Sequence, residues 1–103
     1  MVHIAIDRSR IEAFCRKWKI TEFALFGSVL RDDFRPDSDV DVLVSFADDA
    51  HWGLFDLVRM ENELTGIFGR KVDLVERQEV EANPNYIRRR HILRSLERIH
   101  VAG

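Results

Sequence analysis

Residues 20–46 read ITEFALFGSVLRDDFRPDSDVDVLVSF, and this stretch decides the fold. Ile20–Phe26 is rich in apolar and β-favouring residues and stops at Gly27, which predicts a strand that runs into a glycine turn. Asp39–Phe46 predicts a second strand, because apolar and acidic residues alternate at its start. We therefore expect the chemistry of this chain at the turn and at the start of the second strand.

Side chains alternate across a strand, so the second strand should carry its valines on one face and Asp39 and Asp41 on the other. A third strand is predicted at Lys71–Glu76, where Asp73 stands between two apolar residues. If the second and third strands are neighbours, all three carboxylates share one face of the sheet.

These residue types fit a nucleotide site. Gly27 lets backbone N–H groups come close to a phosphate, and Ser28 adds a hydroxyl donor. Asp39 and Asp41 suit Mg²⁺, which takes one or two carboxylates together with phosphate oxygens. A second ion needs a further carboxylate, for which Asp73 is the candidate, either as its ligand or as a general base for the acceptor hydroxyl.

The remaining pattern predicts an α/β fold with a small mixed β-sheet backed by helices. One helix should open at Ser9, capped by its hydroxyl with Glu12 reaching back, and a short one should follow at residues 28–34. Another should run from Leu54 to about Gly66, and a last one from about Asn83-Pro84 to His100. The expected core-facing residues of these helices are Ile11, Phe14, Cys15 and Trp18, then Leu54, Leu57, Val58, Glu61 and Leu64, and finally Ile92, Leu93, Leu96 and Ile99.

Composition narrows the class of protein. A chain of 103 residues has room for one domain, which we expect to span residues 1–103. Charged residues make up 33% and the formal net charge is -2, so a direct nucleic-acid ligand is not expected. No run reaches the roughly 20 apolar residues of a membrane span, and we expect a cytoplasmic protein. Cys15 is the only cysteine, so an internal disulfide is excluded, and we expect it to be buried.

The segments Phe26–Arg31 and Ser38–Val44 resemble the signature of the polymerase-β-like nucleotidyltransferase superfamily, in its minimal (MNT) branch. That signature is Gly-Ser, ten intervening residues and Asp-x-Asp, which this sequence matches from Gly27 to Asp41. The later Asp73 matches the single aspartate that completes the family triad. Arg31 is also kept, where it would either contact phosphate or pair with a neighbouring aspartate such as Asp32.

The resemblance implies a magnesium-dependent enzyme with two ions and ATP as substrate. Small chains of the MNT branch are similar to antitoxins of HEPN/MNT pairs, which transfer AMP to a tyrosine of the HEPN toxin and form a hetero-oligomer with it. Two alternatives stay open. The chain could be an antitoxin that neutralises by binding alone, or a nucleotidyltransferase acting on a small molecule such as an aminoglycoside.

Overall fold

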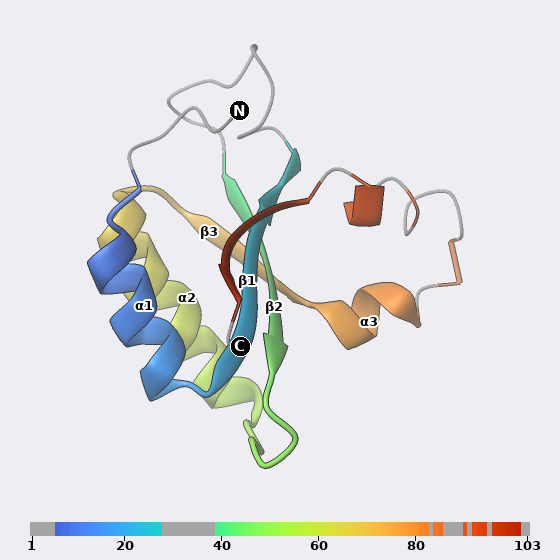
Figure 1. Ribbon diagram of the computed structural model, residues 1–103, viewed down its shortest axis with the longest axis horizontal. Helices are drawn as coiled ribbons and strands as arrows, with labels where there is room; N and C mark the ends of the chain where they lie inside the picture. Colours follow the sequence, from blue (N-terminus) through green and yellow to red (C-terminus); the bar gives the residue numbers. More distant parts are fainter. Residues whose placement is uncertain are drawn as a thin grey trace.

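The computed structural model describes residues 6–27, 39–82, 84–85, 90, 92–94 and 96–101. In that part of the chain, four strands form one sheet: β1 (Ile20–Phe26), β2 (Val40–Phe46), β3 (Val72–Glu76) and β4 (Glu97–Val101). Their order across the sheet is β3-β2-β1-β4 (Figure 1). β1 runs antiparallel to β2 and β4, whereas β2 and β3 are parallel. The expected small mixed sheet is confirmed.

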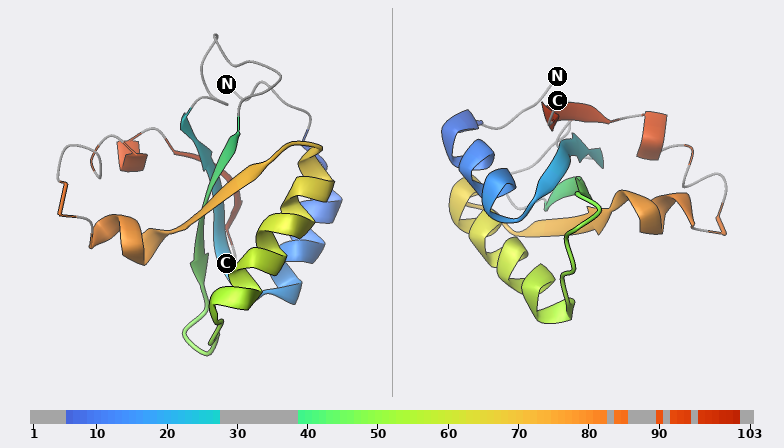
Figure 2. Two further views of the ribbon diagram at one scale, coloured as in Figure 1. Left: turned by 180° about the vertical axis from the view of Figure 1, so that it is seen from behind. Right: turned by 60° about the horizontal axis from the view of Figure 1, so that its bottom comes forward.

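Two helices cover one face of this sheet. α1 (Arg8–Lys17) and α2 (Leu54–Phe68) lie side by side on it in both views of Figure 2. Beneath them is the main core, which includes the expected α1 residues and the valines of β2. Its buried members are Ile11, Phe14, Cys15, Trp18, Ile20, Phe23, Leu25, Val40, Val42, Val44, Met60, Leu64 and Val72.

The aromatic and sulfur groups of this core are packing groups. Trp18 and Trp52 meet edge to face with ring centroids 5.1 Å apart, and Trp52 Nε1 donates to the carbonyl of Trp18 at 2.8 Å. Burial, with a smaller effect of nearby Glu12, raises the pKa of the Cys15 thiol to about 12. Cys15 is therefore a protonated, unreactive core residue.

The start of α1 and the end of α2 both differ from the positions that the sequence predicted. α1 is capped by Asp7, whose carboxylate accepts from the backbone N–H of Arg10 at 3.2 Å, and Ser9 lies inside its first turn. Asp7 is the cap in place of Ser9 because the side chain of an aspartate that directly precedes the helix can reach this free N–H group. α2 passes through Gly66 and ends at Gly69, which has the left-handed φ of 70° that terminates a helix.

The buried stripe of α2 also differs from the expected one. Met60 and Leu64 are fully buried, whereas Leu54 and Val58 are exposed. The helix is rotated so that Leu57, Met60, Leu64, Ile67 and Phe68 meet the sheet. When a helix has many apolar residues, the sequence pattern alone does not predict which of them will pack against the sheet.

The other face of the sheet carries a second, smaller core. A short helix that the sequence reasoning missed, α3 (Arg77–Glu81), places Val80 against Leu43. Phe26 and Ile92 complete the buried cluster, and Leu93 and Leu96 pack against it. Both faces of the sheet are therefore covered along part of their length.

The expected last helix is only partly right. Arg90 and residues 92–94 are helical, but residues 97–101 form β4, whereas Asn83, the expected cap, lies outside the described residues. β4 forms because the edge of β1 offers free backbone groups and Ile99 can pack on the main core from there. Among the described residues, no helix combines the length and the apolarity needed to cross a membrane.

Candidate functional site

Asp41 and Asp73 are direct neighbours across two strands. In the parallel pair formed by β2 and β3 they occupy the same register position, next to the pair Val40 and Val72. Adjacent strands lie about 4.8 Å apart, so the two carboxylates leave the same face of the sheet close together. The sequence left open whether these two strands are neighbours, and the structure shows that they are.

Gly27 lies against this pair. Phe26, the last residue of β1, is in register with Asp41, and Gly27 follows it with a φ of 74°. A Cβ atom at Gly27 would overlap Oδ2 of Asp41. A side chain is excluded here by both the backbone conformation and the space, so the glycine turn and the acidic strand form one site.

Asp39 stands just before β2 and is exposed, as is Asp73, while Asp41 is half-buried. The backbone N–H of Val40 donates to the carbonyl of Lys71 at 2.9 Å, which keeps the segment around Asp39 beside the start of β3. Ser28 and Arg31, the other expected nucleotide contacts, lie outside the described residues, as does the expected helix at residues 28–34.

The carboxylate pair fits a hard divalent cation by its chemistry, since Mg²⁺ prefers carboxylate and phosphate oxygens. In the described ranges, however, no three His, Cys, Asp or Glu side chains come together closely enough to hold a metal ion by themselves. The protein groups that the structure places here would thus supply only part of a coordination shell. Water or ligand oxygens would have to supply the rest.

The same face of the sheet carries an ion-pair network that the sequence reasoning did not single out. Glu22 of β1 accepts from Arg77 Nε at 2.6 Å, from Arg77 Nη2 at 2.9 Å and from Arg98 Nε at 2.6 Å. The hydrogen bonds from Arg77, then those from Arg98 and Ser45, hold the pKa of Glu22 at about 2 despite partial burial. A glutamate inside a mostly apolar strand was the signal that could have revealed it.

This network is distant from the carboxylate pair. β1 runs from Glu22 toward Phe26, so the network lies at the end of the sheet opposite Gly27. On the same face of β2, the apolar side chain of Leu43 lies between Asp41 and Ser45, the residue that pairs with Glu22. We assign the network a structural role, because it joins α3 and β4 to β1.

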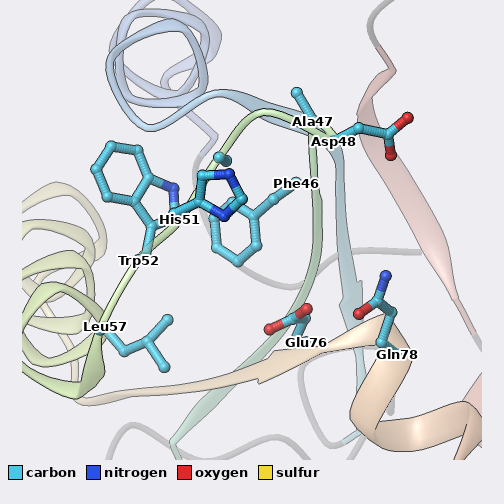
Figure 3. Close-up of a pocket in the computed structure, with 10 residues that line it drawn as sticks. Phe46, Ala47, Asp48, His51, Trp52, Leu57, Glu76 and Gln78 are labelled. Atoms are coloured by element: carbon cyan, nitrogen blue, oxygen red, sulfur yellow. The ribbon is translucent and has the colours of Figure 1, made fainter.

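A pocket of about 630 Å³ also lies at that opposite end (Figure 3). It is formed by the loop after β2 and by the residues where β3 meets α3, among them Trp52, His51, Glu76 and Gln78. Phe46 is five residues beyond Asp41, which is about 17 Å at roughly 3.3 Å per strand residue. The pocket is thus separate from the carboxylate site.

Residues 8–97 match the protein family described as "Nucleotidyltransferase domain". The chain belongs to this family, and the glycine turn beside the carboxylate pair is its candidate active site. One curated relative is the protein adenylyltransferase MntA of Thermococcus cleftensis, which is 32% identical over 66 residues. That match covers 64% of this chain and 65% of the relative, so it spans just under two thirds of either protein.

Solved structures share the fold. One, described as a toxin–antitoxin crystal structure with AMP-PNP, superimposes with a TM-score of 0.71 at 18% identity, over 95% of this chain and 76% of the other. Another is described as a tri-AMPylated Shewanella oneidensis HEPN toxin in complex with an MNT antitoxin. It gives a TM-score of 0.61 at 18% identity, over 92% of this chain and 70% of that one.

Proposed function

We propose that this chain is a protein adenylyltransferase that moves AMP from ATP to a tyrosine hydroxyl of a HEPN-type toxin, for which it serves as antitoxin. The observation that carries the proposal is the register pairing of Asp41 with Asp73 beside Gly27. The curated relative named MntA and the fold shared with HEPN–MNT complexes support the same reaction and partner. We place the reaction in the cytoplasm.

In this proposal the turn holds the nucleotide. The backbone at Gly27 lies directly against the Asp41 carboxylate, since glycine has no side chain to separate them, and it would hold the triphosphate next to that carboxylate. Ser28 would donate its hydroxyl to a phosphate oxygen, and Arg31 would neutralise phosphate charge. These contacts fix the α-phosphate near the carboxylates, which supplies the positioning on which phosphoryl transfer depends.

Asp39, Asp41 and Asp73 would hold two Mg²⁺ ions together with the phosphates. Bound there, magnesium would supply charge stabilisation for the attacking and leaving oxygens.

The reaction is an in-line displacement. The tyrosine oxygen bonds to the α-phosphorus, the bond from that phosphorus to the bridging oxygen breaks, and pyrophosphate leaves. The hydroxyl proton passes to the Asp73 carboxylate or to solvent. Asp73 is exposed, so an acceptor side chain from another protein can approach it.

The test uses the full chain, its co-encoded partner, Mg²⁺ and ATP labelled at the α-phosphate. Asp41→Asn and Asp73→Asn should each lower label on the partner by at least about 100-fold, since metal-assisted charge stabilisation is worth several kcal/mol. Glu12→Gln, which removes an exposed carboxylate from α1, is the matched control and should label normally.

Two results would contradict the proposal. If wild type and Asp41→Asn neutralise the toxin equally and neither transfers label, the chain acts as a binding antitoxin. If label appears on an aminoglycoside and not on protein, the reaction class holds but the acceptor is wrong.

A further inference from the structure

The start of α2 exposes three apolar side chains together. Leu54 is 77% exposed, Phe55 is 86% exposed and Val58 is 48% exposed, although all three belong to a well-formed helix. Met60 and Leu64 of the same helix are fully buried, so α2 has a filled inner face and a second apolar group that faces outward. Adjacent exposed apolar side chains of this size mark interaction sites.

The pocket at the end of β2 is also built in part from the start of α2. Gly53, the residue before the helix, and Leu57 of its first turns line the pocket, so the pocket and the three exposed side chains share the same end of this helix. Trp52 and Leu57 supply one wall, and Glu76 and Gln78 stand across from them in Figure 3. We call the three exposed side chains and this pocket the α2 docking surface.

The charge around this surface is acidic. Asp48 and Glu76 line the pocket, and neither forms an ion pair with another residue in the described ranges. Asp49 nearby is paired with Lys19 at 3.0 Å, and Asp56 accepts from the backbone N–H of Gly53 at 3.0 Å. The opposing groups are His51 in the pocket and Arg59, the one cation of α2, whereas Lys19 and Arg77 are already paired with Asp49 and Glu22. A complementary partner segment therefore carries apolar side chains and a lysine or arginine.

We propose that the α2 docking surface binds the acceptor protein through a segment that packs apolar side chains on Leu54, Phe55 and Val58. A basic side chain of the same segment enters the pocket beside Asp48 and Glu76. The identity of the partner as a HEPN-type protein rests on the proposed function. The surface lies at the end of the sheet opposite Asp41, so docking leaves the carboxylate site open.

This placement separates docking from chemistry. A partner held at the α2 docking surface is retained whether or not its tyrosine is at the carboxylates. Changes at the surface should therefore raise the KM for the partner, while kcat at saturating partner stays the same. Substitution of Asp41 should instead lower kcat and leave the KM for the partner unchanged.

The test measures partner binding by titration calorimetry with the full chain and its co-encoded partner. Phe55→Asp should weaken binding by at least 10-fold, and Glu76→Gln should weaken it less and reduce its salt dependence. Ala13→Asp, which adds the same charge to an exposed position of α1, is the matched control and should bind as wild type. Melting curves of the free chain, with and without Mg²⁺ and ATP, should be alike for Phe55→Asp and wild type.

Several outcomes separate this proposal from the proposed function. Unchanged binding and KM in Phe55→Asp would overturn the docking surface while the transfer reaction stands. Normal docking without label transfer would overturn the reaction and leave the docking surface in place. If the free chain is a dimer that Phe55→Asp dissociates while partner binding is unchanged, the surface joins two copies of this chain and the proposal is wrong.

Discussion

At Gly27 two constraints meet on one residue. Its φ of 74° is the left-handed conformation that costs other residues about 1–2 kcal/mol, and a Cβ atom there would overlap the Asp41 carboxylate. Gly27→Ala should therefore destabilise the fold and also push Asp41 out of line with Asp73. We expect AMP transfer to fall by roughly 100-fold, the cost of a displacement of about 1 Å at a reacting centre. Labelled ATP measures this loss.

Gly69→Ala is the control for that substitution. Gly69 has a similar φ of 70°, but a Cβ atom there would meet nothing within 4 Å. It should lose about 1–2 kcal/mol of stability and keep full transfer activity. If both variants transfer AMP equally well, the contact between Gly27 and Asp41 has no part in the reaction.

The sequence pattern predicted the positions of some single residues in the structure but not those of others. The face of the sheet on which Asp41 and Asp73 lie was predictable, because side chains alternate between the two faces along each strand. The α1 cap was not, because Asp7 and Ser9 are both good capping residues and the choice depends on where the helix begins.

At the scale of elements, Glu22 connects four of them. It accepts hydrogen bonds from Arg77 of α3, Arg98 of β4 and Ser45 of β2, and its side chain is only 13% exposed. Glu22→Gln should lower the free energy of unfolding at pH 7 by about 2 kcal/mol, because the hydrogen bonds lost are to a charged group. Urea unfolding measures the change.

The effect of pH on this variant has a definite sign. The pKa of Glu22 is lowered in the folded protein from 4.5 to about 2, so its carboxylate stabilises the fold above about pH 4.5. The difference between wild type and Glu22→Gln should shrink as the pH falls from 4.5 toward 2. Glu12→Gln, in an exposed pair with Arg16, should cost no more than about 0.5 kcal/mol at any pH. A difference between wild type and Glu22→Gln that stays constant across this range would show that the charge of Glu22 is not what matters.

The sequence predicted well the elements whose structure follows from their own residues. It did not predict those that form only through contact with distant segments of the chain. β1 has the bounds expected from its composition. Arg98–Val101 could extend either a helix or a strand, and only the free edge of β1, more than 70 residues earlier, selects the strand. α3 has five residues, too few for a periodic pattern to be visible.

At the scale of the whole molecule, the sheet has two separate apolar layers. Leu43 is fully buried in the smaller one, where it meets Val80 and Ile92. Leu43→Ala should lower the free energy of unfolding by about 2–4 kcal/mol through the cavity it leaves, as measured in urea. Leu54→Ala, at a position 77% exposed, should change it by no more than about 0.5 kcal/mol. Equal losses would mean that Leu54 is covered in solution.

The sequence by itself indicated the family and the small mixed sheet, because the Gly-Ser and Asp-x-Asp spacing and strand alternation are local properties. The roles of Gly27, Ser28, Arg31, Asp39, Asp41 and Asp73 in binding and catalysis stay predictions. That residues 1–103 form one domain stays a prediction. Tertiary structure alone decided that β2 and β3 run side by side with Asp41 opposite Asp73, that β4 closes the edge of β1, and that Phe55 faces outward. The physical reason is that each of these features depends on which strand edge or apolar face a distant segment pairs with or packs against. A local pattern of residues does not predict such contacts.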